Sequence, residues 1–497
     1  MSRLMKGLGL FVAVFALVAV AVLWRWEATA RAITLTDVIV YLGLLPLVIF
    51  AMGFGLVWAW KGATPRHEAA LAQAAERRSA TAAPPPAPTA SDENLRHARL
   101  QLLSAQVLCA AGDTPSAVLA AAAEGKPRPD LANGLRDSDG LAVLCARIPD
   151  LGTQPVDAVL ERVMPSLQRQ RPEWSALVPG EHVLRALAAL SEPLKSALHA
   201  LHPWAERLGA PADARPTASL PAPPAGGLPI VRLVLGWPVD WNDFERELAT
   251  AWARLHVAEH ADLPATAIAL SSHAVTGAEL WLQVDQLTQT LTRDGREDLI
   301  LLAAAHSDIG PVPVGRLAEA QRLFSSARRP RGAVPGETAA ALLLAPERWP
   351  ADPAADQPPV TLHRAAVQRR DKSVDGAGRT SSQSLQDAAT HALAAARCEP
   401  GAVGAVVCDA DQHSPRGPEF YGAVQALMPQ LDAATDVAAL GTINGHIGAV
   451  DALLAVATAA QRARDDSKPC LAVTLGDPFM RLALVARPPQ PEHPEPA

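Results

Sequence analysis

Short and almost wholly apolar runs recur along this chain of 497 residues, and segments with a helical pattern separate them. The clearest runs are 298–304 (DLILLAA) and 339–344. Apolar side chains at successive positions indicate a strand that is covered on both faces, because a half-exposed strand would alternate apolar with polar residues. Strands that alternate with helices predict a layered α/β protein. Further strands are expected at 97–109, 231–237, 266–271, 360–369, 402–408, 470–475 and 481–485, with helices at 115–124, 241–255, 278–291, 384–395 and 449–463.

Composition narrows the class of protein. Hydrophobic residues make up 49% of the chain but aromatic residues only 4%, so the core must be built from Ala, Val and Leu. The formal net charge of −7 gives no general basic surface, which argues against a nucleic-acid partner. The five cysteines show neither a CxxC pair nor zinc-ligand spacing, so the sequence predicts reduced, buried thiols, no metal site and no cofactor.

Two apolar runs near the N-terminus, 8–24 and 38–60, are each long enough to span a bilayer. A cleaved signal peptide is the alternative, because Arg3 and Lys6 precede the first run. The second run follows after a short loop, and no clear small-residue cleavage site lies between the two. We therefore predict a transmembrane helical hairpin at residues 1–62, integral to a membrane.

Basic residues indicate how the hairpin is oriented. They lie before the first run and again after the second, at Lys61 and Arg66. The positive-inside rule then places both ends of the hairpin, and the rest of the chain, in the cytoplasm of a bacterium, at the inner membrane.

The remaining chain divides at Pro-rich segments. Residues 63–93 are an Ala/Pro-rich linker of the semi-rigid type, and 489–497 are a Pro-rich tail. A large domain is predicted at 94–488. Its first half would be 94–348, with an insertion at about 155–228, and its second half 358–488.

Several segments resemble the β-ketoacyl synthases of the thiolase superfamily. Arg322–Pro346 is similar to the family's Arg-Pro-Phe-Asp segment, which continues through an Arg-rich loop and Gly-Glu-Gly-Ala-Gly into an apolar strand. Further resemblances occur in the family's order at Leu100–Lys126, Gly295–Leu302, Ala439–Ala449 and Lys468–Val473. The resemblance implies a thiolase-like layered α/β/α fold of two pseudo-repeated halves, and a homodimer formed through a sheet edge.

The catalytic positions of that family are mostly missing here. The family's spacing places the nucleophilic cysteine near Ala278, yet no cysteine lies between Cys145 and Cys398. A thiolate holds the acyl group in these enzymes, so this loss removes the covalent step. A hydroxyl in 265–285, such as that of Ser272, would need a strong adjacent base to replace it.

The two active-site histidines of the family are only partly retained. The first falls on Cys408 or Asp409, and His413 would reach the site only if its loop bulged. An acidic, solvated turn is the preferred interpretation of that loop. The second corresponds to His446, while the family's lysine falls on Gly441. His446 is therefore a vestigial catalytic candidate, and Ser272 and His413 are weaker ones.

Other polar or aromatic groups are weaker signals. His306-Ser307-Asp308 has the composition of a catalytic triad, but consecutive residues cannot form its hydrogen-bonded line, and a turn is expected there. One possible docking surface consists of Arg328, Arg329 and Arg331, with a solvated loop as the alternative. Another consists of Trp237 and Trp241, with a place in the core as the alternative.

These observations predict a membrane-anchored, catalytically inactive ketosynthase-like protein. Its expected role is that of a scaffold or adaptor in an inner-membrane assembly, such as a bacterial secretion system. The alternative is an enzyme or sensor of lipid or polyketide metabolism that binds acyl thioesters, with acyl carrier protein as its partner.

Overall fold

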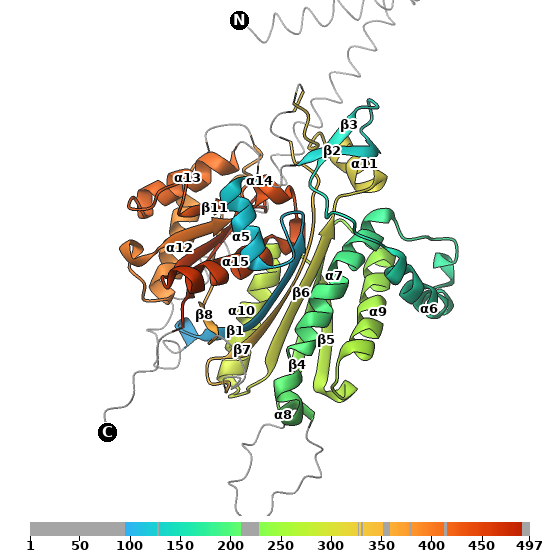
Figure 1. Cartoon of the computed structure of the whole chain (residues 1–497), viewed down its shortest axis with the longest axis horizontal. Helices are drawn as coiled ribbons and strands as arrows, with labels where there is room; N and C mark the ends of the chain where they lie inside the picture. The colour runs from blue at the N-terminus through green and yellow to red at the C-terminus, as the bar shows by residue number, and fades with distance from the viewer. Residues whose placement is uncertain are drawn as a thin grey trace, which may run out of the picture. The chain divides into compact units, whose positions relative to one another are not determined.

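The structure, a computed structural model, describes residues 95–126, 129–209, 228–326, 328–329, 332–350, 358–376, 380–411 and 415–489 (Figure 1). The predicted spans 8–24 and 38–60 and the linker 63–93 lie outside the described residues, as does most of the tail. Within those ranges, no helix is both long and apolar enough to cross a membrane.

The described chain alternates between strands and helices, as the sequence predicts. The strands are β1 (Arg99–Cys109), β2 (Asp130–Arg136), β3 (Ala142–Cys145), β4 (Val231–Trp237), β5 (Ile268–Ala274), β6 (Leu299–Ser307), β7 (Glu337–Pro346), β8 (Val360–His363), β9 (Ala366–Arg369), β10 (Ala405–Cys408), β11 (Val437–Ala439), β12 (Cys470–Thr474) and β13 (Met480–Arg487). The helices are α5 (Pro115–Glu124), α6 (Gln154–Gln170), α7 (Glu181–His199), α8 (Ala205–Gly209), α9 (Asp243–His260), α10 (Gly277–Arg293), α11 (Pro311–Glu319), α12 (Gln383–Ala395), α13 (Arg416–Leu427), α14 (Gly441–Asn444) and α15 (Asp451–Asp466).

The large sheet repeats one strand pattern. From one edge its strands run in the order β5-β4-β6-β7-β1, and from the other edge in the order β11-β10-β12-β13-β8. In each set the first three strands are parallel, and each of the last two runs antiparallel to the strand before it. The two sets meet where β1 pairs with β8. The fold thus consists of two halves with the same topology.

Alternation along the central strands explains their unbroken apolar sequence. On β6, Leu299 and Leu301 face a core under α7 and α9, while Ile300 and Leu302 face the opposite core, which contains α10 and α15. Successive side chains of a strand point to opposite faces, so a strand covered on both faces must be apolar at every position.

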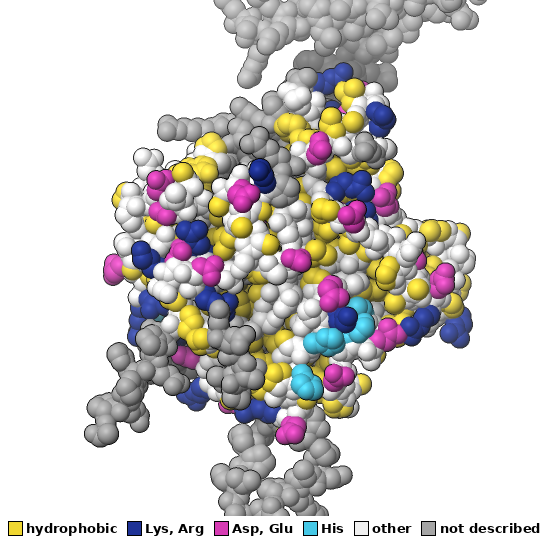
Figure 2. Space-filling model, in the orientation of Figure 1, with side chains coloured by type: hydrophobic (Ala, Val, Ile, Leu, Met, Phe, Trp, Pro, Cys, Tyr) yellow, Lys and Arg dark blue, Asp and Glu magenta, His cyan; other side chains and the backbone are white. Residues whose placement is uncertain are grey.

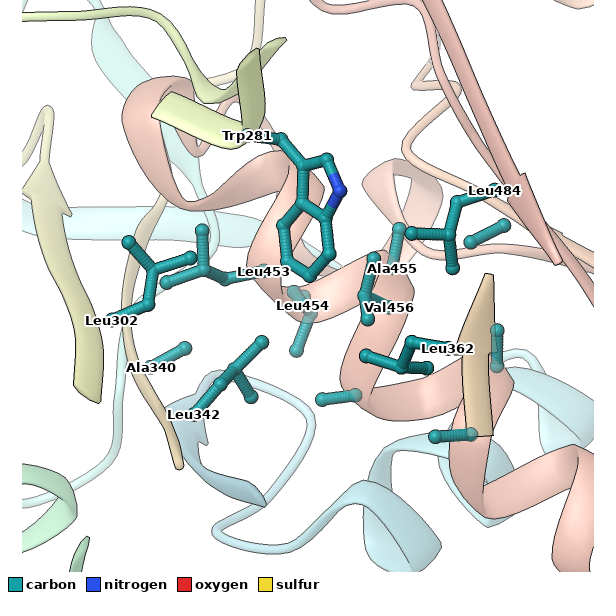
Figure 3. Close-up of a cluster of buried hydrophobic side chains, with 14 of the residues drawn as sticks. Trp281, Leu302, Ala340, Leu342, Leu362, Leu453, Leu454, Ala455, Val456 and Leu484 are labelled. Carbon is teal, nitrogen blue, oxygen red and sulfur yellow. The ribbon is translucent and has the colours of Figure 1, made fainter. Parts of the chain in front are cut away.

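The central core lies between the two halves of the sheet. Leu302 and Leu342 from the first half and Leu362 and Leu484 from the second pack around α10 and α15 (Figure 3). A third core joins the second half to α12 and α13. The layers of the fold therefore follow the order helices, first half of the sheet, helices, second half of the sheet, helices.

Acidic and basic side chains are interspersed on the face shown in Figure 2, as the modest net charge suggests.

The predicted strand at 360–369 is wrong as a single element. The structure has two short strands, β8 and β9, with a break at Arg364 and Ala365. The guanidinium of Arg364 leaves the strand to pair with Asp285 on α10, at 2.9 Å. A charged side chain bound to the neighbouring helix explains the break.

The region predicted as an insertion, 155–228, supplies α6, α7 and α8. Helix α7 packs against β6 and β7, and it also donates hydrogen bonds to one buried carboxylate. Glu337, which is 0% exposed, accepts hydrogen bonds from Arg185 of α7 at 2.5 and 2.8 Å and from the backbone N–H of Ile148 at 2.7 Å. It also accepts one from the hydroxyl of Ser307 at 3.2 Å. This carboxylate therefore joins β7, β6, α7 and the chain before α6.

We predict that Glu337→Ala lowers the free energy of unfolding by about 3–5 kcal/mol, because it leaves the buried guanidinium of Arg185 without a counter-charge. Urea denaturation followed by circular dichroism measures the change. The matched control is Glu347→Ala, which removes an exposed pair with Arg99 and should cost at most about 1 kcal/mol. Equal effects of the two substitutions would contradict this account of Glu337.

Candidate functional site

A cavity of about 290 Å³ lies where parallel strands of both halves end. Its wall includes Val239 after β4, Asp308 after β6, Asp409 after β10 and Asp477 after β12. Loops at the carboxyl ends of parallel strands converge on one side of a sheet, which is the usual position of ligand sites in α/β proteins. Here the two halves direct such loops into one cavity.

Three of the wall residues, His306, Asp308 and His446, form a compact cluster. Asp308 Oδ2 lies 2.7 Å from His446 Nδ1 and 3.2 Å from His306 Nε2, although the second contact is not aligned as a hydrogen bond. His306 and Asp308 share a face because they are two positions apart in extended chain. Ser307 points the other way, toward Glu337.

A glycine turn positions His446. It follows Gly445, whose φ of +67° belongs to the left-handed region that favours glycine. The backbone N–H of His446 donates to Val334 O at 2.8 Å, which fixes the loop against the residues before β7. The imidazole is then held over the end of β6, where its ring lies 5.2 Å from that of His306.

The electrostatics of the cluster favour a charged Asp308. Burial raises the pKa of its carboxyl group, but the facing His306 and His446 outweigh burial, so the pKa lies well below the usual range. For His306, burial lowers the pKa, and the negative charge of Asp308 more than offsets this, so the pKa is raised. The cluster can therefore hold a positive charge against one carboxylate.

Two further acidic residues, Asp409 and Asp451, line the same cavity, and both are buried. Asp409 accepts hydrogen bonds from the N–H groups of Leu475 and Gly476, each at 2.7 Å. Asp451 begins α15, and burial followed by the negative charge of Asp409 raises its pKa well above the usual value. Two buried carboxyl groups that contact each other favour sharing a proton.

The carboxyl group of Asp451 also fills the space at the start of α10. A Cβ atom built on Gly277, the first residue of α10, would lie 1.6 Å from Asp451 Oδ1. Only glycine permits this approach, so the α10 N-terminus and the α15 N-terminus meet at this carboxyl group.

We predict that Asp451→Asn stabilises the protein at pH 8. The folded state binds the Asp451 proton more tightly than the unfolded chain does, so this stability is present at low pH and is lost as the pH rises toward the raised pKa. The amide keeps the shape without needing the proton, and a gain of about 1 kcal/mol would raise Tm by roughly 2 °C.

Melting curves of Asp451→Asn at pH 5 and pH 8 test whether the stabilisation increases with pH. The difference from wild type should be larger at pH 8, whereas the exposed Asp262→Asn should show no such dependence. A variant that is less stable at pH 8 than at pH 5, relative to wild type, would exclude a shared proton.

The predicted nucleophile position is placed beside the cavity but carries no reactive group. Ala278 is the second residue of α10 and is buried, while the neighbouring Thr276 lines the cavity. All five cysteines are buried and unpaired, none lines the cavity, and burial raises the pKa of Cys109 to about 12.

The other catalytic candidates are not brought together. Ser272 lies on β5, where its Oγ accepts a hydrogen bond from the hydroxyl of Thr250 at 3.1 Å, and it lines a different cavity from that of His446. His413 lies outside the described residues.

The arginines and tryptophans suggested as docking surfaces have different outcomes. Arg328 is exposed and pairs with Asp139, Arg329 donates to Ala318 O at 3.3 Å, and Arg331 lies outside the described residues. Trp237 and Trp241 are 1% and 2% exposed. The docking interpretation of the tryptophans is therefore wrong, because their rings stack in the core, with centroids 5.8 Å apart.

Sequence reasoning missed most of the cluster. It interpreted His306-Ser307-Asp308 as a turn because consecutive residues cannot form a triad, although Asp308 contacts His446 and the ring of His306 lies 5.2 Å from that of His446. The available signal was a His-x-Asp pattern at the carboxyl end of a buried strand, where alternate residues share a face. Asp451 carried no such signal.

Comparison with known proteins identifies the fold. No protein-family model and no curated protein matches the sequence. A mutant ketosynthase from module 6 of the bacillaene synthase of Bacillus subtilis 168 is similar in structure, with a TM-score of 0.53 and 14% identity over 80% of this chain and 73% of that chain. A ketosynthase in complex with its chain length factor, from Xenorhabdus doucetiae, has a TM-score of 0.50 and 12% identity over 79% and 98% of the respective chains.

The similarity extends to a ketosynthase domain of oxazolomycin synthesis from Streptomyces albus JA3453, with a TM-score of 0.50 and 13% identity over 80% of this chain and 76% of that chain. This chain therefore has the thiolase-like ketosynthase fold. At such low identity, the comparison shows the fold alone.

Proposed function

We propose that this chain is a ketosynthase-fold protein that does not catalyse condensation and works instead as a scaffold. The proposal is supported by the start of α10, where Ala278 lies near the position that the ketosynthase spacing predicts for the nucleophile and Asp451 fills the adjacent space. A methyl group cannot attack a thioester or hold an acyl group.

The nearest hydroxyl is already engaged in capping α10. Thr276 Oγ1 accepts from the N–H of Glu279 at 3.3 Å and lies 3.2 Å from the carboxylate of the same residue. This capping box satisfies N–H groups that begin the helix. The hydroxyl of Thr276 therefore has a structural role, and His446 contacts Asp308 rather than Thr276.

We predict that the purified full-length chain forms no acyl-enzyme. Incubation with acyl-thioesters and with a covalent ketosynthase inhibitor should leave the intact mass unchanged, because no accessible thiol lies at α10. The positive control is an active ketosynthase treated alongside. An acyl adduct on any residue between 265 and 285 would overturn the proposal of inactivity.

The scaffold is proposed to be anchored in the bacterial inner membrane by residues 1–62, with the folded region in the cytoplasm. Support comes from the two apolar runs and the basic residues that flank them. We further propose a dimer formed through β5, which ends the path of the large sheet and is only partly buried. An edge strand can pair with a second copy. The Xenorhabdus structure, a ketosynthase in complex with its chain length factor, supports pairing by this fold.

We predict that the full-length chain, extracted in detergent and cross-linked, co-purifies with membrane-assembly subunits in near-stoichiometric amounts, such as those of a secretion system. Cross-links between two copies should map near β5. A chain that begins at residue 63 is the control, and it should leave the membrane fraction. Retention of that shorter chain in the membrane, or recovery of the full chain without membrane subunits, would contradict the anchored scaffold.

Binding of acyl thioesters is the second candidate function. The cavity beside α10 favours it, because part of its wall is apolar, from Val239, Val275 and Ile447, and His446 faces the same space. Co-purification with acyl carrier protein instead of membrane subunits would support this function over the scaffold.

A further inference from the structure

The proposed scaffold role leaves the cluster of His306, Asp308 and His446 unexplained. His306 is 4% exposed, and neither of its ring nitrogens has a hydrogen-bond partner among the described residues. Nε2 lies 3.2 Å from Asp308 Oδ2, but a contact that is not aligned as a hydrogen bond replaces only part of the hydration that a buried imidazole loses. A ligand bound at Nε2 would satisfy that nitrogen.

We propose that His306, Asp308 and His446 bind one divalent transition-metal ion, with zinc as the ion that the ligand set fits best. The proposed donors are His306 Nε2, Asp308 Oδ2 and His446 Nδ1. One donor atom from each residue lies within 4.8 Å of the others, and this is the one such trio within the described part of the chain. Two imidazoles and one carboxylate form a three-residue zinc site of the open type.

The two separations between the carboxylate donor and the imidazole donors are close to those that a metal requires, and the two imidazole donors lie within 4.8 Å of each other. Oδ2 lies 2.7 Å from His446 Nδ1 and 3.2 Å from His306 Nε2. Bonds of about 2.0–2.1 Å in tetrahedral geometry place donors roughly 3.3 Å apart. His446 Nδ1 would move away from the carboxylate by about 0.6 Å, from 2.7 to roughly 3.3 Å. The side chain of His446 is partly exposed.

The surroundings of His306 direct its free nitrogen toward the cluster. A Cβ atom built on Gly448 would lie 2.5 Å from His306 Nδ1, so backbone closes that side of the ring. The opposite nitrogen, Nε2, faces Asp308. The ring thus has one donor available, and it points at the carboxylate.

The negative charge of the site favours binding of a divalent cation. Asp308 supplies one negative charge, and a metal would replace the proton that otherwise bridges an imidazole and the carboxylate. Three arginines line the same cavity, Arg316, Arg322 and Arg416. Arg316 is paired with Asp240 at 2.9 Å, and Arg416 donates to the backbone oxygens of Leu475 and Gly476 at 2.8 and 2.9 Å. The three donors border the cavity, which gives a path for the ion and room for water at the fourth position.

The test uses the full-length protein in detergent. After removal of metals with a chelator, it is titrated with Co²⁺, and the ligand-field absorption is followed in visible light. Zinc then displaces the cobalt, and elemental analysis measures zinc in the dialysed protein. We expect one ion per chain.

Asp308→Asn keeps the volume and removes the charge, and His446→Gln removes a donor. Each should weaken zinc binding by at least about 100-fold. The control is Glu245→Gln, which alters another buried contact of a carboxylate with a histidine, His182, at 3.1 Å, and should leave zinc affinity unchanged. Zinc should raise Tm of wild type and of the control, but not of Asp308→Asn, which circular dichroism must show to be folded.

Two outcomes would overturn the site. One is a wild-type chain that binds neither ion at micromolar concentration, which would leave a His–Asp–His cluster without metal. The other is zinc affinity that is the same in Asp308→Asn and His446→Gln as in wild type, which would place the ion elsewhere. Metal content and absorption do not depend on acyl chemistry or on membrane partners, so this result is independent of the proposed function.

Discussion

The burial of α15 on every side is the constraint on which the rest of the structure depends. From Ala452 to Ala460 its side chains are essentially inaccessible, and they contact both halves of the sheet as well as α10. A helix that is apolar all round is stable only when it is surrounded. Its many alanines let the layers approach closely, which explains how a chain with few aromatic residues builds a dense core.

This packing also determines the site. The first residue of α15 is Asp451, and the loop before it carries His446, so the helix that fills the centre also brings both groups to the cavity. Because α10 packs beside α15, the start of α10 meets Asp451. A fold can keep the layers that hold these elements while the residues at their ends change, because core packing and site chemistry rest on different side chains.

The prediction of individual elements followed the strength of their local signals. Helix 115–124 and strand 231–237 have the bounds that their turn residues and apolar runs predict. The expected strand at 360–369 failed because an ion pair between Arg364 and Asp285, distant in sequence, breaks it. Trp237 at the end of β4 and Trp241 after it were open to two interpretations, since sequence shows that a residue is apolar but not whether another layer covers it.

The sequence by itself determined the layered α/β class, the resemblance to ketosynthases, and the lack of any cysteine between Cys145 and Cys398. These follow from periodicity, from motifs in order and from residue identity, which are local properties. Only the tertiary structure decided that His306 and Asp308 meet His446, and that Asp451 occupies the start of α10. Such contacts join residues more than a hundred positions apart, and their distances depend on how two halves of one sheet pack around α15.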